Sequence, residues 1–371
     1  MYQCLNKTKI SKELYMIKKR NACLSLFVVF SILFITASCS NDNIFIPDVS
    51  DIEVGISTVR TEQVTQELDT NNIVNAIQAL QDGADSTFYS LYFEYILRLN
   101  VNQLKAEEQK KYMLGFLKDE GINRIFHEVD SVYQDFVPQE KAFEKAFQYL
   151  KYYFPKKATP KVYTYISEFS YQKFVFEPEP GIDGLAIGLD MYLGADYPYR
   201  KYVGNNENFS AYLTRRYDRD HLVSSVISAL VEDMLGNAAP GENLLEKMIY
   251  HGKKLYILDK LLPNTPDHIL MQYTEEQWEW VQNNEQEMWA FLFKEKLFYS
   301  TDINKINKLV NPSPTSSGMP SESPGRTANY LGWQITSAFM KRNPDMSLQD
   351  LINFEDSQEI LEKSKFKPKR N

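Results

Sequence analysis

The stretch from Asn243 to Pro263, NLLEKMIYHGKKLYILDKLLP, is the segment around which the rest of the chain is organised. Its apolar residues recur at helical spacing and predict a helix with a wide buried face; they are Leu244, Leu245, Met248, Ile249, Leu255, Tyr256 and Leu258. In its middle His251 and Lys253 flank Gly252, a position where glycine costs about 1 kcal/mol relative to alanine. The glycine is therefore explained either by chemistry at His251 or by close helix packing.

The composition predicts a well-folded acidic protein. Of its 371 residues, 43% are apolar and 13% aromatic, which is enough for one large core or two modest ones. The net charge is -8, and no basic surface of the nucleic-acid-binding kind is evident. We therefore expect no nucleic acid among the partners.

The N-terminus has the three parts of a secretion signal. A basic run, Lys18 to Arg20, precedes an apolar run from Leu24 to Ile35, and small residues then lead to Cys39. The apolar run is shorter than the roughly 20 residues of a transmembrane helix. The arrangement resembles a bacterial lipoprotein signal, which implies cleavage before Cys39 and acyl chains, palmitate among them, on the new N-terminal cysteine. The alternative is an uncleaved signal anchor.

Cysteine usage agrees with this prediction. Cys4 and Cys23 would leave with a signal peptide of residues 1–38, and Met16 is an alternative start within it. The mature chain would hold no disulfide. Removing six basic and one acidic residue from a chain with 41 basic and 49 acidic residues gives a net charge of -13. Attachment to the bilayer would then rest on the acyl chains. We expect a membrane-anchored lipoprotein of the cell envelope that faces the periplasm, on either the inner or the outer membrane.

The remaining sequence predicts an α+β fold that is predominantly α-helical, with a small mixed sheet packed with helices. A tether spans residues 39–50. A strand-plus-helical region, 51–158, opens on a strand at Ile52, Val54, Ile56 and Val59. Its predicted helices are Asn71–Gln81, Ser86–Leu99, Lys105–Lys118, Ile122–Phe136 and Gln139–Phe154.

A second α+β region, 159–371, is expected to form one integrated fold with the first. Its predicted strands are 162–166, 174–176 and 184–192, and its helices are 219–235, the opening stretch, 328–341, a short helix capped by Ser347, and 356–363. Thr274 and Gln277 form a capping-box pattern ahead of one long helix that runs through Trp278 and Phe293. Between them, 311–326 is a Pro/Ser/Gly loop.

Few residues have the spacing of a catalytic or metal site. There is no phosphate-binding loop and no G-x-S-x-G motif. The four histidines are His127, His221, His251 and His268, and none has another four residues away. His127-Glu128 begins a metallopeptidase-like motif, but Ser131 stands where its second histidine would be. We therefore assign no catalytic residue, no metal and no cofactor.

Two further features have two interpretations each. The four tryptophans, Trp278, Trp280, Trp289 and Trp333, would line a ligand groove or, as such residues usually do, fill the core. The loop 311–326 would act as a lid or partner site, or simply as a spacer. The basic tail from Lys363 to Arg370 is typical of a solvated chain end.

Several segments together resemble the gliding-motility lipoprotein GldB family of Bacteroidetes; they are AIGLDMYLGADYP, LLEKMIYHGKKLYILDKLLP, YTEEQWEWVQNNEQEMWAFLFKEKLFYSTD, SPGRTANYLGWQITSAFMKRNPDMSLQDL and KSKFKPK. The resemblance covers the mature chain and is strongest over residues 181–368. It departs at Thr327-Ala328-Asn329, where the family usually reads Arg-Ile-Gly. It implies a non-catalytic envelope lipoprotein of the gliding and type IX secretion apparatus, with envelope proteins of that machinery as partners.

The chain is also more distantly similar to predicted H-E-x-x-H zinc peptidases. His251-Gly252 would stand where those proteins carry a Glu-Gly pair, so the resemblance implies a zincin-like scaffold without its metal site. We name Glu232, Glu246 and His251 as the candidate cleft of this degenerate site. The strand Ile182–Tyr192 would then receive an extended peptide by strand addition. The alternatives are a zinc-dependent peptidase-like hydrolase with an unrecognised site and an envelope adaptor that binds peptide or glycan.

Overall fold

The computed structural model describes residues 46–99, 104–236, 239 and 241–370, and Asp48–Asn371 forms one compact unit. The predicted signal peptide and Cys39 lie outside the described residues. The helices are α2 (Thr61–Gln66), α3 (Ile73–Gln81), α4 (Ser86–Leu91), η1 (Tyr92–Ile96), α5 (Ala106–Lys118), α6 (Glu120–Tyr133), α7 (Val137–Tyr153), η2 (Leu189–Tyr192), α8 (Arg200–Val203), η3 (Glu207–Phe209), α9 (Ala211–Thr214), α10 (Arg219–Leu235), α11 (Leu244–Leu261), α12 (Asp267–Met271), α13 (Glu275–Asn283), α14 (Glu285–Lys294), α15 (Ile303–Val310), α16 (Thr327–Arg342), α17 (Leu348–Asn353) and α18 (Ser357–Ser364).

Four strands form one mixed sheet in the order β1-β2-β4-β3; they are β1 (Thr58–Arg60), β2 (Lys161–Tyr165), β3 (Lys173–Glu179) and β4 (Ile182–Gly188). The first three in this order are parallel, and β3 is antiparallel to β4. The prediction of a predominantly helical α+β fold with a small mixed sheet is confirmed. The sheet places β4 inside, where Leu185, Ala186 and Ile187 are fully buried. Strand addition to Ile182–Tyr192 is therefore a wrong prediction, because both edges of β4 already have partners.

Two predicted strands are shorter in the structure. Only Thr58–Arg60 of the first segment is a strand, because β2 pairs with just these three residues. Ile52, Val54 and Ile56 precede it without strand pairing and pack against the core from half-buried positions. At the other end, β4 stops at Gly188 and turns into η2, where the Asp190 carboxylate accepts the N–H groups of Ser167 (3.1 Å) and Phe169 (2.7 Å).

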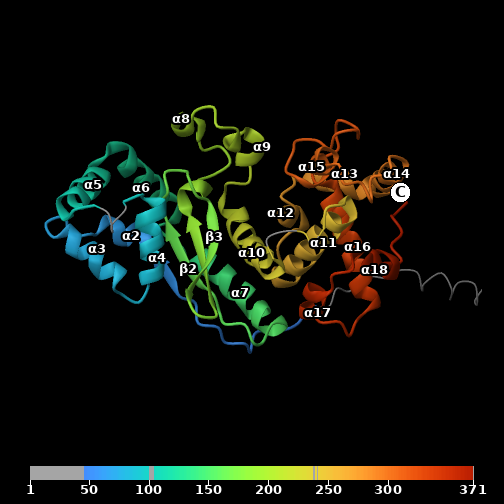
Figure 1. Cartoon of the computed structure of the whole chain (residues 1–371), viewed down its shortest axis with the longest axis horizontal. Helices are drawn as coiled ribbons and strands as arrows, with labels where there is room; N and C mark the ends of the chain where they lie inside the picture. Colours follow the sequence, from blue (N-terminus) through green and yellow to red (C-terminus); the bar gives the residue numbers. More distant parts are fainter. Residues whose placement is uncertain (1–45, 100–103, 237–238, 240, 371) are drawn as a thin grey trace, which may run out of the picture. The chain divides into compact units, whose positions relative to one another are not determined.

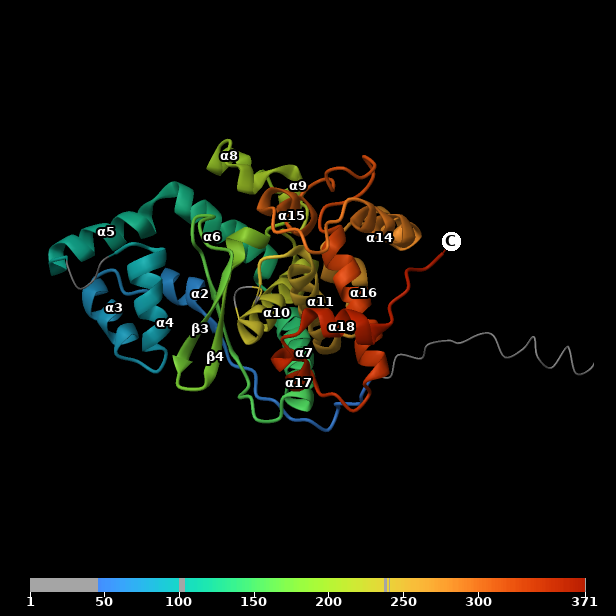
Figure 2. The same cartoon turned by 45° about the vertical axis from the view of Figure 1, so that its right-hand side comes forward.

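Helices flank the sheet on both sides (Figures 1 and 2). On one side α4 packs on β3, and its Phe88 ring lies 4.6 Å from the Tyr163 ring and 5.5 Å from the Phe176 ring. On the other side α10 contacts β3 and β4 and then packs on α11. The sheet thus lies between α4 on one side and α10 on the other, and α7 packs on α10 and α11, on the side that carries the candidate residues.

The helical predictions are best where local signals set the ends. Helix α10 has the predicted bounds, and Asn243 and Thr274 both cap their helices with the capping-box contacts. The prediction of a single long helix through the tryptophans was wrong, because the helix is interrupted at Asn284, between α13 and α14. There the Asn284 side-chain N–H donates to the Trp280 carbonyl at 2.8 Å. Helices α2, α8, α9, α12 and α15 were not predicted.

Helices α11 and α16 cross at two glycines. A Cβ built on Gly252 would lie 2.2 Å from the carbonyl oxygen of Gly332, and one on Gly332 would lie 1.9 Å from that of Met248. Real Cβ atoms do not approach backbone oxygen this closely, so neither position admits a larger residue without a shift of a whole helix. The geometry therefore confirms that Gly252 serves close helix packing.

Candidate functional site

A polar cavity of about 250 Å³ lies between the start of β3, helices α10 and α11, and the chain that follows α12 and α15. We call it the β3–α10 pocket. Its charged and polar lining consists of Gln172, Lys173, Arg216, His221, Ser225, Ser228, Glu232, His251, Lys254, Gln272, Asn311, Arg326 and Asn329. Apolar lining comes from Ala229, Leu255, Leu270, Met271, Val310 and Pro312. The pocket therefore collects residues from six separate stretches of sequence.

The structure brings two of the three predicted cleft residues together. Glu232, near the end of α10, and His251, in the middle of α11, both line the β3–α10 pocket. Glu246 does not line it. Its carboxylate accepts the backbone N–H of Asn243 at 2.8 Å, and its own N–H donates to the Asn243 side chain at 3.0 Å. Glu246 thus completes the capping box of α11 and stabilises the start of that helix.

The pocket carries an excess of positive charge. Lys173, Arg216, Lys254 and Arg326 line it, whereas Glu232 is the single carboxylate in the lining. That carboxylate is already paired, because Lys254 Nζ lies 2.7 Å from Glu232 Oε2. The other three cations have no carboxylate partner in the lining. A positively charged pocket contrasts with the acidic chain as a whole.

Burial, and after it the mutual repulsion of the cations, lowers the pKa values of two of them. Burial lowers the pKa of Lys173 to about 8, with the charges of Arg216 and Lys254 acting in the same direction. Burial and the charge of Arg326 likewise lower the pKa of Arg216 to about 10. Both groups still carry positive charge at neutral pH, so the pocket holds this charge against a free-energy cost.

Three arginines share one neutral residue, Gln272, which follows α12 in the left-handed conformation with φ 56°. Arg216 and Arg326 both donate to its side-chain oxygen, the latter at 3.1 Å. Arg215 and Arg326 donate to its backbone carbonyl at 3.1 and 3.2 Å. An amide oxygen satisfies donors but does not neutralise three guanidinium charges. Buried charges are normally paired, so this cluster favours an anionic ligand.

His251 is held neutral. Burial lowers its pKa to about 4, and the nearby charge of Lys254 acts in the same direction. A neutral imidazole has one N–H donor and one nitrogen acceptor. Tyr250 packs edge-on against its ring at 5.3 Å between centroids. His251 can therefore form hydrogen bonds with a ligand, but it adds no charge to the pocket.

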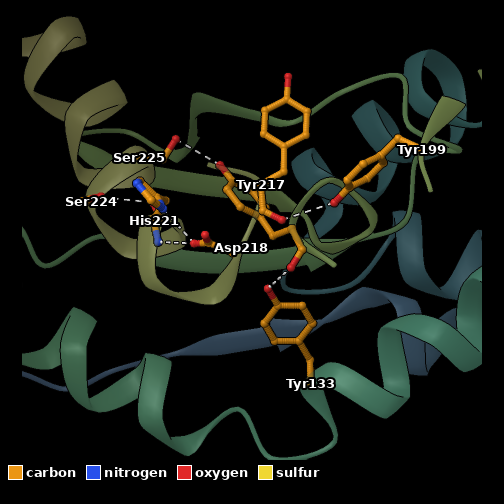
Figure 3. A network of polar contacts seen from close by, with 8 residues as sticks. Tyr133, Tyr199, Tyr217, Asp218, His221, Ser224 and Ser225 are labelled. Atoms are coloured by element: carbon orange, nitrogen blue, oxygen red, sulfur yellow. Dashed lines mark hydrogen bonds and ion pairs between the residues drawn. The ribbon is translucent and has the colours of Figure 1, made fainter. Parts of the chain in front are cut away.

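A contact between Asp218 and His221, which the sequence did not predict, lies at the N-terminal end of α10. Asp218 caps the helix by accepting the backbone N–H of His221 at 2.9 Å, and its carboxylate also lies 2.8 Å from the His221 Nδ1 (Figure 3). Burial acts to raise the pKa of Asp218, but the hydrogen bond and charge of His221 outweigh it and lower the pKa. The spacing Asp-x-x-His at the start of an apolar helix was the available signal.

Ser225 lies one turn further along α10 and is held from the other side. The Tyr192 hydroxyl donates to its Oγ at 3.1 Å, and the Tyr133 hydroxyl donates to the Tyr192 carbonyl at 2.7 Å (Figure 3). Among the described residues, no hydrogen bond joins the His221 ring to a serine hydroxyl. The Asp218–His221 pair therefore lacks the bonded nucleophile that a serine-hydrolase triad requires.

The donor set does not fit a metal ion. Within the part of the chain that the structure describes, no three His, Cys, Asp or Glu side chains gather closely enough to hold one. The half-motif at His127 is on the exposed side of α6, where the Ser131 hydroxyl donates to the Glu128 carbonyl at 2.8 Å. In the β3–α10 pocket, Lys173 and the arginines would repel a divalent cation.

The four tryptophans are not part of the lining of the β3–α10 pocket, and three of them pack against other aromatic residues. Trp278 contacts Tyr330 and Trp333 at 5.6 and 5.9 Å between ring centroids, and Trp289 contacts Phe298 at 4.8 Å. This packing favours the core interpretation. The loop 311–326 is held by its own bonds, with the Ser316 hydroxyl donating to the Pro324 carbonyl at 2.7 Å, and its two ends line the pocket.

No helix in the described residues is both long enough and apolar enough to cross a bilayer. The fold and the pocket define a helix-rich α+β protein with a positively charged cavity. Comparison with known families is more specific: the model of the gliding motility protein GldB matches residues 42–368, and the chain belongs to that family. It is accordingly a gliding-motility-associated envelope protein. Comparison with curated proteins and with solved structures finds no match.

Proposed function

We propose that this protein is a non-catalytic lipoprotein of the cell envelope that acts by protein contact within the gliding and type IX secretion apparatus. The β3–α10 pocket is the observation that supports contact over catalysis. Its charges are suited to holding a ligand, since three of its four cations lack a carboxylate partner in the lining, and the one carboxylate is bonded to the fourth cation, Lys254. A general base needs a free carboxylate or imidazole near the operating pH. Of the two predicted cleft residues in the pocket, Glu232 is paired and His251 has a pKa of about 4. The other imidazole in the lining, His221, is bonded to the Asp218 carboxylate, and no serine hydroxyl among the described residues is bonded to its ring.

The membrane anchor belongs to the same proposal. Acyl chains on Cys39 would hold the protein to the periplasmic side of the inner or the outer membrane. The predicted tether, residues 39–50, would then join this anchor to the folded part of the chain. A folded body on a short tether can reach other envelope proteins while it stays at the bilayer surface.

Two measurements test the proposal. In fractionated cells, Cys39→Ala should move the protein from the membrane to the soluble fraction, and continued membrane attachment would contradict lipidation at Cys39. Affinity purification of the lipidated protein from envelope extracts should enrich one or a few motility or secretion proteins. The acyl-free form on beads serves as a second bait. Enrichment no greater than with empty beads, for both baits, would refute action by protein contact.

A zinc-dependent peptidase-like hydrolase is the second candidate, favoured by one observation. His221, Glu232 and His251 line the same cavity beside the strand β3, although no three such side chains among the described residues lie close enough together to hold a metal ion. Metal analysis of the purified protein decides between the two. Stoichiometric zinc that is lost in His251→Ala would establish the metal site and overturn the proposal of a scaffold without one. A peptide- or glycan-binding adaptor remains compatible with the first proposal.

A further inference from the structure

We propose that the β3–α10 pocket binds a carboxylate of a partner polypeptide, with Arg216, Arg326 and Lys173 as its cationic contacts. This inference rests on the proposed function, since it names the chemistry by which the protein would contact its partner. It concerns a pocket for one side chain or chain end, and it requires no covalent step.

The first support is the charge of the pocket lining. Two guanidinium groups converge on the neutral Gln272 side chain, and Lys173 lines the same cavity. The described contact of the Lys173 ammonium is the neutral Gln172 side-chain oxygen, at 3.2 Å. An incoming carboxylate would relieve the repulsion among three cations and accept hydrogen bonds from planar guanidinium forks.

The second support is a pair of buried polar atoms without a partner. Arg326 Nε and Asn329 Oδ1 are both shielded from solvent and lack a hydrogen-bond partner among the described residues, and both side chains line the pocket. The Asn329 amide is oriented by its N–H, which donates to the Val310 carbonyl at 3.0 Å. One unsatisfied donor and one unsatisfied acceptor fit a ligand that offers both an anionic oxygen and an N–H. A peptide offers both.

The third support is the size and lining of the cavity. Its volume of about 250 Å³ is below the roughly 300–1,000 Å³ of typical small-molecule and cofactor sites. It is large enough for one or two amino-acid side chains. Leu255, Met271 and Pro312 supply apolar contact for the carbon atoms next to a carboxylate. The exposed Asn311 at the rim leaves room for the partner chain to continue outward.

The proposal is tested by calorimetric titration of the acyl-free chain from residue 40 onward, which contains the whole compact unit. The probes are three peptides: acetyl-alanyl-glutamyl-leucine with a free carboxyl end, the same peptide as its amide, and the amide with glutamine in place of glutamate. We expect at least tenfold tighter binding of the glutamate amide than of the glutamine amide. The free-acid peptide shows whether a chain end adds to the side chain. Sodium acetate and inorganic phosphate are titrated separately.

Variants locate the binding. Lys173→Gln and Arg216→Gln should each weaken binding of the glutamate peptides at least tenfold. Lys118→Gln, a charge change on exposed α5, should leave it unchanged. If Arg216→Gln fails to fold, Lys173→Gln carries the test, because its described side-chain contact is confined to Gln172.

Equal binding of all three peptides, unchanged binding in the Lys173→Gln variant, or no binding of any acidic peptide would overturn the proposal. Binding of phosphate without acidic peptide would overturn it as well. These results can be distinguished from those of the envelope purification. If the Lys173→Gln and Arg216→Gln variants still enrich the same envelope partner, the partner does not bind through the pocket, but the proposed function by protein contact is retained.

Discussion

The backbones of Gly252 and Gly332 touch where helix α11 crosses α16, and no side chain separates them there. A Cβ on Gly252 would lie 2.2 Å from the Gly332 carbonyl oxygen and 2.6 Å from the Thr336 hydroxyl. Gly252 is therefore the residue of α11 that fixes this helix against α16. Since His251 precedes Gly252 directly, this crossing also sets where the imidazole lies in the β3–α10 pocket.

Replacing Gly252 by alanine should destabilise the protein by about 2–4 kcal/mol, because the obstructing atoms are backbone and overpacking a tight contact costs roughly this much. Urea denaturation measures the free energy of unfolding. Gly115→Ala is the matched control: it lies inside helix α5 with nothing within 4 Å of the added Cβ. There alanine should be neutral or stabilising by up to about 1 kcal/mol. Equal effects at both glycines would show that the crossing is not tight.

Acid should weaken the fold through His251. Its folded pKa of about 4 lies below the ordinary value of 6.5, so between these values the unfolded chain binds a proton that the native protein does not. The stability contributed by the neutral ring is complete above pH 6.5 and is lost as the pH falls towards 4, at no more than about 1.4 kcal/mol per pH unit. The difference in unfolding free energy between wild type and His251→Gln should therefore change across this window. A constant difference would contradict a buried neutral imidazole.

Asp190 should stabilise the turn that leads into the pocket wall. Its buried carboxylate accepts the N–H groups of Ser167 and Phe169, and Phe169 has a left-handed φ of 61°. Asp190→Ala leaves two donors without an acceptor and should cost about 2–5 kcal/mol. Asp190→Asn keeps one oxygen and should cost less.

The pH dependence of Asp190 has the opposite sign to that of His251. Burial raises its pKa to about 6 from the ordinary 3.8, against the opposing effect of its hydrogen bonds. The native state then holds the extra proton between these values, so this group's contribution falls as the pH rises from about 4 to 6. In urea denaturation measured at a series of pH values, the unfolding free energy of Asp190→Asn should not show this fall. An unchanged pH profile in the asparagine variant would place the carboxylate in a more hydrated environment than the structure does.

Local signals made much of the fold predictable. Apolar periodicity indicated α10 and α11, whose starts are capped in the structure by Asp218 and Asn243, and Thr274 with Gln277 marked the start of α13. The pairing of β4 between β2 and β3 depends on contacts far apart in sequence, so no strand pattern revealed that β4 is internal. The length of β1 was overestimated for the same reason, because it is set by the three residues that pair with β2.

The candidate site was predictable only in part. His251 and Glu232 stood out as a rare histidine and a helix-end acid, and the structure places both in one pocket. Glu246 carried a capping-box signature with Asn243, which explains it without a role in the pocket. Lys173, Arg216 and Arg326 come from three distant segments and meet only through the tertiary fold. No spacing within the sequence could have grouped them.

Site-specific cross-linking in intact cells tests most directly whether this protein acts by contact through the β3–α10 pocket. A photo-reactive benzoylphenylalanine replaces the exposed rim residue Asn311, and the same group at position 118 on α5 is the control. We expect one envelope protein to be captured from position 311 and not from 118, with at least tenfold less capture when Lys173→Gln and Arg216→Gln are added. Capture that is the same from both positions, or that is unaffected by loss of the pocket charges, would contradict a contact made through this pocket.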